Sequence, residues 1–193
     1  MRYVDSHCHV HDIEDADGLL ARARAAGVTT VVAVGTDLAA SERAVSLARR
    51  HADVRAAVGL HPHDASRFAD EWDALAALAT DDHVVAVGEA GFDLHYRHST
   101  EAEQEEAFRA HVRLAHETDR ALVIHTREAW EQTFRVLEDE RVPPRTVFHC
   151  FTGGPTEARR CLDTGASLSF SGIVTFKSAV SYTHLTLPTK RIV

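Results

Sequence analysis

The sequence predicts an α/β protein organised around one parallel β-sheet. Short apolar segments rich in β-branched residues alternate along the chain with amphipathic segments of helical period. The segment at 28–34 is apolar along nearly its whole length, which is typical of a parallel strand covered by helices on both faces. Strands are predicted at residues 3–9, 28–34, 54–60, 84–89, 121–126, 146–151 and 167–172.

Each connection between these strands carries a helical pattern. In the first connection apolar residues recur at helical spacing, and Gly27 marks the end of the helix. The longest helix has charged residues along its exposed side. Helices are predicted at residues 15–26, 39–50, 71–79, 100–118, 129–138 and 156–162.

A parallel sheet with helical crossovers is either an open doubly wound sheet or a closed barrel. The glycine fingerprint of a dinucleotide-binding sheet is missing after the first strand. Polar residues instead end several different strands, which is how barrels assemble their sites. We therefore predict a (β/α)8 TIM-barrel type that is incomplete, with about seven strands and the eighth missing; the strand-end residues are His9, His61, Glu89, His125 and His149.

Residues 1–177 are expected to form one domain, because a chain of 193 residues suffices for one sizeable core. After residue 177 the amphipathic pattern stops, and residues 178–193 differ in composition from the chain before them. We expect 178–193 to be a non-native tail joined to a truncated reading frame, with a natural divergent end as the alternative.

The composition limits the choice of partners and compartment. The formal charge of 21 − 29 = −8 argues against a large nucleic-acid-coating surface, but it allows a local basic channel or phosphate contacts through metal ions. Cys8, Cys150 and Cys161 are few, odd in number and not in CxxC spacing, which favours a reducing compartment. With no signal peptide and no bilayer-spanning apolar run, we expect a cytoplasmic protein without a membrane partner; its oligomeric state stays open.

The strand ends carry the residue types of a metal site. His7 and His9 are two residues apart on an extended segment, so both imidazoles face one side while Cys8 faces the other. Glu89 ends an apolar strand, where a carboxylate is costly unless it is paired or bound to metal. A single histidine at the end of a buried strand is more often a core residue, but its repetition on several strands favours a ligand set. Imidazole and carboxylate together suit zinc or manganese, and magnesium less naturally.

Five short motifs contain these strand-end residues. They are Asp5-Ser6-His7-Cys8-His9, Gly59-Leu60-His61-Pro62-His63, Gly88-Glu89-Ala90-Gly91-Phe92-Asp93, Val123-Ile124-His125-Thr126-Arg127-Glu128 and Phe148-His149-Cys150-Phe151-Thr152-Gly153. In this order, from about residue 3 to residue 177, they resemble the successive signatures of TatD-family metal-dependent deoxyribonucleases. The resemblance implies a TIM-barrel phosphodiesterase with two divalent metal ions (Zn, Mn or Mg) that acts on DNA, single-stranded or at 3′ ends.

The resemblance also implies roles for individual residues. His7 and His9 would hold the first metal, Glu89 would bridge both metals as the catalytic carboxylate, and His125 with His149 would hold the second. Asp93 could orient a ligand histidine. Further side chains on the same face could contact phosphate, or else cap loops: His61, His63, His95, Arg97 and Arg127.

One feature of the family pattern is missing. Family members supply an aspartate from strand eight in a Glu-Thr-Asp-type motif, and no such motif follows Gly172. Asp163 lies at a helix end before the seventh strand and cannot replace it. Two alternatives to a DNase therefore stay open: a metal-dependent hydrolase of another ester or amide, such as an aminoacyl ester, and a metal-binding fragment with impaired catalysis.

Overall fold

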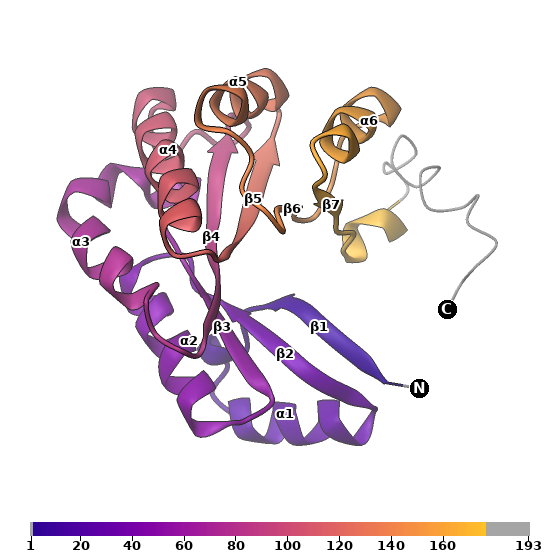
Figure 1. Ribbon diagram of the computed structural model, residues 1–193. Helices are drawn as coiled ribbons and strands as arrows, with labels where there is room; N and C mark the ends of the chain where they lie inside the picture. The colour runs from indigo at the N-terminus through magenta and orange to yellow at the C-terminus, as the bar shows by residue number, and fades with distance from the viewer. Residues whose placement is uncertain (1, 177–193) are drawn as a thin grey trace.

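The computed structural model describes residues 2–176, so the expected tail at 178–193 lies outside the described residues. Within them, strands and helices alternate in chain order (Figure 1). The strands are β1 (Tyr3–Cys8), β2 (Val28–Val34), β3 (Val54–Val58), β4 (Val84–Asp93), β5 (Ala121–Arg127), β6 (Val147–Phe148) and β7 (Ser167–Leu168).

Three of the helices, α1, α2 and α4, begin at polar caps that the sequence supplies. Asp37 accepts a hydrogen bond from the Ala40 amide at 2.7 Å, and Thr100 forms a capping box with Glu103. No helix within residues 2–176 has an apolar stretch of the length that a bilayer requires. The helices are α1 (Ala16–Ala25), α2 (Leu38–Arg50), α3 (Phe68–Leu78), α4 (Glu101–Glu117), α5 (Trp130–Glu140) and α6 (Pro155–Asp163), with short 3-10 turns η1 (Val10–Asp12), η2 (Pro62–Arg67) and η3 (Gly172–Thr175).

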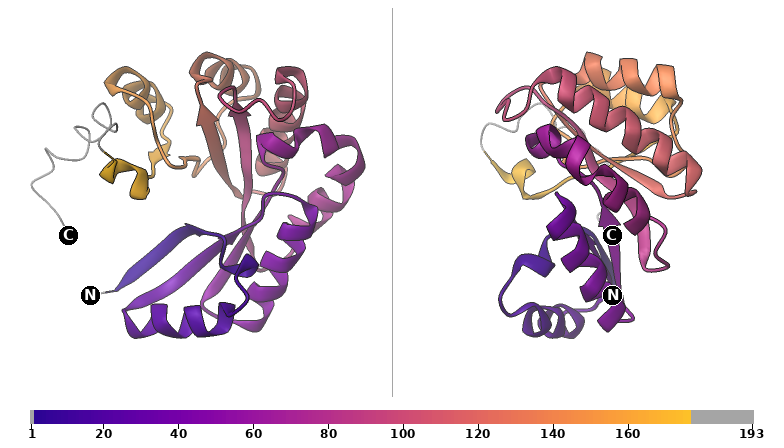
Figure 2. Two further views of the ribbon diagram at one scale, coloured as in Figure 1. Left: turned by 180° about the vertical axis from the view of Figure 1, so that it is seen from behind. Right: turned by 90° about the vertical axis from the view of Figure 1, so that its left-hand side faces the viewer.

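All strands are parallel, and each pairs with the strand before it in the order β1 to β7. The sheet curls with its helices on the outer side, and its concave side opens between β1 and β7 (Figure 1, Figure 2). In the part of the chain that the structure describes, no pairing joins β1 to β7 and no eighth strand is found. The fold is an incomplete (β/α)8 barrel, which confirms the predicted fold class.

Alternate residues of the strands feed two separate apolar clusters. Leu122 and Ile124 belong to the larger cluster, which packs the sheet against the helices. Val123, which points the other way, joins Val34 and Ala57 in a smaller cluster. This period of two is that of a sheet covered on both faces, so the smaller cluster lies inside the curl.

Three strands, β4, β6 and β7, differ most in length from the prediction. β4 extends to Asp93, past the predicted end at residue 89, and therefore presents both Glu89 and Asp93 from one strand. β6 and β7 have 2 residues each, although longer strands are predicted there. Cys150 has a φ of 46°, a left-handed conformation that extended backbone cannot continue through, so β6 ends early.

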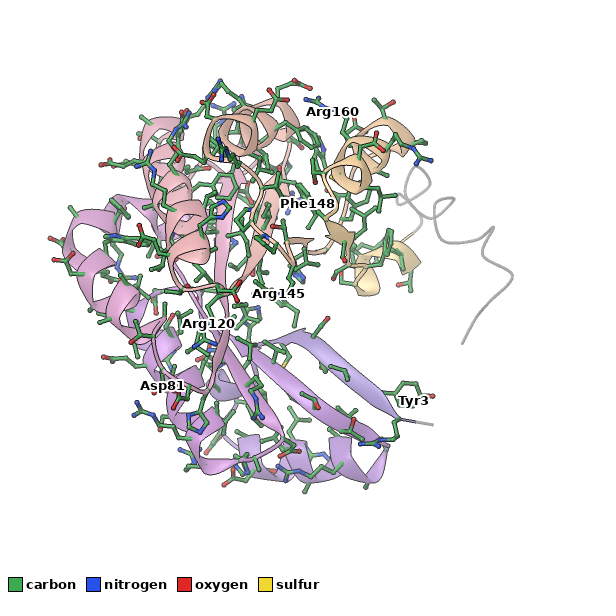
Figure 3. The ribbon with its side chains drawn as sticks, viewed as in Figure 1. Tyr3, Asp81, Arg120, Arg145, Phe148 and Arg160 are labelled. Atoms are coloured by element: carbon green, nitrogen blue, oxygen red, sulfur yellow. The ribbon has the colours of Figure 1, made fainter. Side chains whose placement is uncertain are left out.

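The amino ends of the strands are held by ion pairs and hydrogen bonds. Arg49 contacts Asp81 at 2.5 Å, and Arg120 donates to the Asp81 carbonyl at 3.2 Å before β5 begins (Figure 3). Arg145 contacts Asp119 at 2.8 Å just before β6. Polar residues at this end of a barrel serve stability, whereas the chemistry lies at the carboxyl ends.

Candidate metal centre

Glu89 in β4 lies at the centre of the site and is only 4% exposed. Gly88 and Gly91 on either side have φ values of 120° and 144°, where residues with a Cβ are strained. A Cβ at Gly91 would lie 2.0 Å from the His125 carbonyl oxygen, and one at Gly88 would lie 2.4 Å from that of Val123. Glycine at both positions therefore allows β4 to approach β5 closely. The Gly88–Glu89 peptide bond is cis.

The first group of candidate ligands joins β1 to Glu89. One ligand atom from each of His7, His9 and Glu89 lies within 4.8 Å of the others, while Cys8 packs against the outer core. Nε2 of His7 is buried 3.1 Å from Glu89 Oε2, yet it makes no hydrogen bond within residues 2–176. Nδ1 of His9 donates to the Val34 carbonyl at 2.8 Å, which leaves Nε2 with its lone pair. Both imidazoles can therefore present a lone pair to a metal ion held beside the Glu89 carboxylate.

A second group lies on the other oxygen of the same carboxylate. Oε1 of Glu89 is 2.9 Å from His125 Nδ1 and 3.8 Å from His61 Nε2, and the ligand atoms of these three residues lie within 4.8 Å of one another. His61 follows β3, and the sequence analysis places it among the phosphate contacts. The structure places it among the candidate ligands, with Glu89 shared between the two groups.

His149 lies on the β1 side of the site. Its ring stacks on that of His7 with centroids 3.4 Å apart and an interplanar angle of 8°. Its Nδ1 atom is buried and makes no hydrogen bond within the described chain. The family resemblance implies that His149 shares an ion with His125, and this assignment stays a prediction. In the structure the ring lies next to His7, and His149 belongs to neither of the two ligand groups found among residues 2–176.

Asp93 fixes the second group from behind. It is 1% exposed, and its Oδ2 lies 3.2 Å from His125 Nε2 and 3.0 Å from His63 Nε2. Its Oδ1 accepts hydrogen bonds from the amides of His95 and Tyr96 at 3.1 and 2.9 Å. Asp93 therefore orients the His125 ring on the side opposite Glu89, and it holds His63 as well.

The electrostatics of the site suit divalent ions. Burial lowers the pKa of His61 to about 3 and that of His149 to about 4, so both rings are neutral at pH 7. Burial would raise the pKa of Glu89, but its hydrogen bond with His125 helps to hold this pKa well below the usual range. Burial would likewise lower the pKa of His125, but hydrogen bonds with Asp93 and Glu89 raise it to about 9. Neutral imidazoles and ionised carboxylates are the forms that bind metal, so these residues fit such ions once His125 releases its proton.

The other predicted phosphate contacts lie on the loops beside this group. His95 Nδ1 is 2.8 Å from a carboxylate oxygen of Glu128. Arg97 donates to a carbonyl of its own loop at 2.8 Å. Arg127 lies over the ring of Tyr96 at 4.7 Å. Neither arginine pairs with a carboxylate in the described part of the chain, so both guanidinium groups keep donors available for an anion.

Two residues of α4 that were not predicted from the sequence also support the site. Oε1 of Gln104 accepts the Asp93 amide at 2.8 Å, and Nε2 of His111 accepts the Leu60 amide at 3.0 Å. Both side chains are fully buried. A signal was present, because the two polar residues are seven positions apart and lie on the apolar face of the helix.

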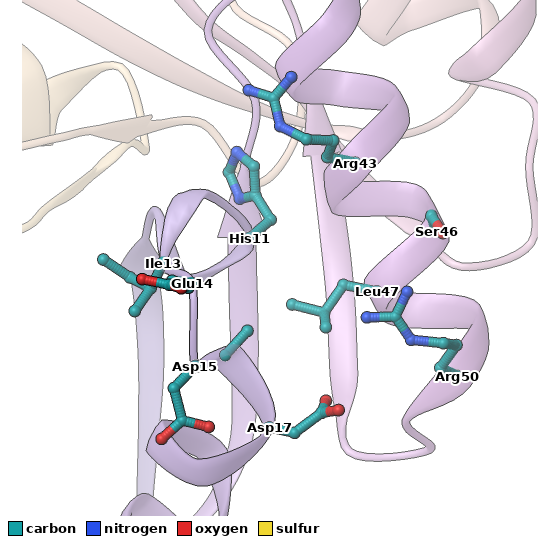
Figure 4. Close-up of a pocket in the computed structure, with 10 residues that line it drawn as sticks. His11, Ile13, Glu14, Asp15, Asp17, Arg43, Ser46, Leu47 and Arg50 are labelled. Atoms are coloured by element: carbon teal, nitrogen blue, oxygen red, sulfur yellow. The ribbon is translucent and has the colours of Figure 1, made fainter.

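A hollow of about 290 Å³ lies between the start of α1 and α2 (Figure 4). His11, Asp17 and Arg43 line it, and both ring nitrogens of His11 are buried without a hydrogen bond in the described residues. Arg43 pairs with Asp12 at 2.7 Å, and Asp17 contacts a histidine of α2's end at 2.8 Å. No residue of the two ligand groups lines this hollow, so it is separate from the metal centre.

Comparison with known proteins shows a family match and similar relatives. The model of the family described as TatD related DNase matches residues 4–193. The chain is 44% identical over 163 residues to a 3′-5′ ssDNA/RNA exonuclease TatD of Cronobacter turicensis, which covers 83% of this chain and 62% of that protein. It is 37% identical to an uncharacterized metal-dependent hydrolase YcfH of Escherichia coli, over 93% of this chain and 70% of that protein.

Solved structures show the same fold. A TatD homologue from Escherichia coli, YJJV, superposes with a TM-score of 0.79 at 28% identity, covering 94% of this chain and 72% of that one. The present chain thus spans less than two thirds of the Cronobacter exonuclease, 62% of its length, and a larger part of the two Escherichia coli proteins. On the family match and these identities, the chain belongs to the TatD related DNase family.

Proposed function

We propose that this chain belongs to a divalent-metal-dependent hydrolase that cleaves phosphodiester bonds of DNA, single-stranded or at 3′ ends. The observation that carries the proposal is the buried Glu89 carboxylate, which has His7 on one oxygen and His125 on the other. One carboxylate shared by two imidazole groups suits a binuclear metal centre. The Cronobacter relative is named a 3′-5′ ssDNA/RNA exonuclease, which supports nucleic acid as the substrate.

In this proposal His7, His9 and Glu89 hold one ion, and Glu89 with His125 holds a second. The remaining ligand of the second ion comes from His61, which lies nearer in the structure, or from His149, which the family resemblance implies. The two ions, Zn, Mn or Mg, would supply Lewis-acid charge at the phosphodiester and a nucleophile at neutral pH.

The remaining residues act on the substrate and on the ligands. Asp93 keeps the ring of His125 in place through its 3.2 Å contact. Arg127 and Arg97 offer guanidinium donors that pair with no described carboxylate, and such donors match the geometry of phosphate oxygens. His63 and His95 lie beside them and would complete the phosphate contacts.

Native mass spectrometry with metal analysis tests the ligand assignment. We expect the wild-type chain to bind two manganese ions at saturation. At the same manganese concentration, Glu89→Gln should bind one ion or no ion. His61→Ala and His149→Ala form a matched pair of single-imidazole removals. The variant that loses the second ion identifies its ligand, and two ions in Glu89→Gln would contradict the shared carboxylate.

An end-labelled single-stranded oligonucleotide with added manganese or magnesium tests the activity. We expect shortening from the 3′ end and a loss of more than about 100-fold in Glu89→Gln, with the fold checked by circular dichroism. A panel of aminoacyl esters and other esters is run alongside. If the chain hydrolyses the esters and leaves the DNA uncleaved, its function is ester hydrolysis and the nuclease proposal is refuted. Two bound ions without any turnover would identify a metal-binding chain with impaired catalysis.

A further inference from the structure

A cavity of about 540 Å³ opens directly beside the metal centre. His125 and His149 line it, together with the apolar side chains of Trp130, Ile173 and Phe176. Its volume falls within the range of roughly 300–1,000 Å³ that small-molecule sites occupy. Because His125 contacts the Glu89 carboxylate at 2.9 Å, a molecule in this cavity would adjoin the bond that the metal centre acts on.

Trp130 gives the cavity a rigid aromatic surface. Its ring centroid lies 5.2 Å from that of Phe151 and 6.1 Å from those of Phe134 and Phe148, so neighbouring aromatic side chains hold it in place. Phe176, also lining the cavity, is 63% exposed and can be replaced without disturbing the core.

Arg127 adds a positive charge to the same cavity, whose lining also includes Glu128, a carboxylate paired with His95 at 2.8 Å. Its guanidinium carbon lies 4.7 Å above the ring of Tyr96, which fixes the position of the group. It pairs with no carboxylate in the described chain, so its charge is available to a bound anion. A planar fork of N–H donors held in this way matches a phosphate group.

An aromatic wall with an unpaired cation is the chemistry that binds a nucleotide, since any base can stack on the ring while the phosphate meets the charge. We propose that this cavity binds the nucleotide unit next to the scissile phosphodiester, with its base against Trp130 and Phe176 and its phosphate on Arg127. The proposal rests on the proposed function, because it takes nucleic acid as the substrate. In this proposal Trp130 and Phe176 bind the substrate by stacking against its base and do not contact its phosphate.

Tryptophan fluorescence can report on this cavity directly. The chain has 2 tryptophans, and Trp72 lies against Phe68 and His111, away from the cavity lining. Trp72→Phe therefore leaves Trp130 as the reporter. The full chain is titrated with thymidine 5′-monophosphate, with thymidine and with inorganic phosphate, each with and without manganese. Calorimetry on the same samples measures affinity independently of the fluorescence signal.

We expect saturable quenching by thymidine 5′-monophosphate, weaker binding of thymidine, and no quenching by inorganic phosphate. Phe176→Ala should weaken binding of both thymidine compounds about tenfold, equivalent to about 1.4 kcal/mol. Phe170→Ala is the matched control, because this exposed aromatic side chain does not line the cavity, and it should leave both affinities unchanged. Arg127→Gln should remove the preference for the monophosphate over thymidine.

Three results would overturn the inference: no nucleotide binding by either method, equal affinities in Phe176→Ala and Phe170→Ala, or an unchanged preference for the monophosphate in Arg127→Gln. These results are distinct from failure of the proposed function. Nucleotide binding with the expected variant pattern, in a chain that cleaves no DNA, would support the cavity and refute the nuclease. Cleavage of DNA without that pattern would do the reverse.

Discussion

Acidification should lower the free energy of unfolding through His111, which lies in α4 and is 0% exposed. Its Nε2 accepts the Leu60 amide, so that nitrogen carries no proton, and its Nδ1 lies 2.6 Å from the Ala107 carbonyl. Burial lowers the pKa of His111 from 6.5 to about 4. Between pH 6.5 and about pH 4, His111 is protonated in the unfolded chain but stays neutral in the folded chain. The stabilising effect of the neutral ring is therefore complete above pH 6.5 and is lost as the pH falls toward 4.

The size of this loss follows from the two pKa values. With 6.5 in the unfolded chain and about 4 in the folded chain, the change between pH 7.5 and pH 5.0 amounts to about 2 kcal/mol. Other titrating groups contribute over the same range, so the measurement needs a reference variant. His111→Gln provides one, because glutamine can accept the Leu60 amide and does not titrate.

Urea denaturation of both proteins at half-unit steps from pH 7.5 to 5.0 gives the free energy of unfolding at each pH. We expect the wild-type protein to lose about 2 kcal/mol relative to His111→Gln across this range. All histidines other than His111 are shared by the two proteins and cancel in the difference. A difference that stays constant within about 0.5 kcal/mol would refute the assignment of His111 as a buried neutral acceptor.

Three further predictions concern the metal centre and its supports. Gly91→Ala places a Cβ 2.0 Å from the His125 carbonyl oxygen and should destabilise the protein by more than about 2 kcal/mol in urea denaturation. Gly165→Ala is the control, because its φ is 82° but the space around it is open, and it should cost about 1 kcal/mol in the same assay. Gln104→Leu leaves the buried Asp93 amide without its acceptor and should cost about 1–3 kcal/mol, with weaker manganese binding by calorimetry; unchanged values for both would contradict the positioning role. Manganese at 100 times the dissociation constant of a site should stabilise the wild-type chain by about 2.7 kcal/mol for each site that it fills, measured by thermal denaturation, and a chelator should reverse the effect.

The sequence predicts the fold class well because its signal is repeated in every unit. Each βα unit repeats an apolar run and an amphipathic helix, so an error in one unit does not change the architecture. The ends of β6 and β7 are harder to predict, since the left-handed turn at Cys150 is a local conformation without a composition signal. Polar positions inside helices, such as Gln104, are read as solvent-facing unless their place on the apolar face is counted.

The candidate site is predictable as a set of strand-end residues but not as pairs. The sequence places His61, Glu89, His125 and His149 at the ends of different strands, and the structure brings them to one end of the barrel. Which imidazole lies next to which carboxylate oxygen depends on the register shift between Val87 and Ala90 and on the curl of the sheet. Neither quantity is encoded in a residue pattern, so the approach of His61 to Glu89 and the stacking of His149 on His7 could not be predicted.

The strand order also allows the ligand groups to form early during synthesis. Every strand pairs with its predecessor, and both ligand groups are drawn from residues at or before His125. A chain leaving the ribosome from its N-terminus can add one βα unit at a time, because each new strand finds its partner already in place. Both groups are complete once β5 has docked on β4, before β6 and β7 are added. Metal binding by this nascent sheet of β1 to β5 would then stabilise the template on which the remaining units assemble.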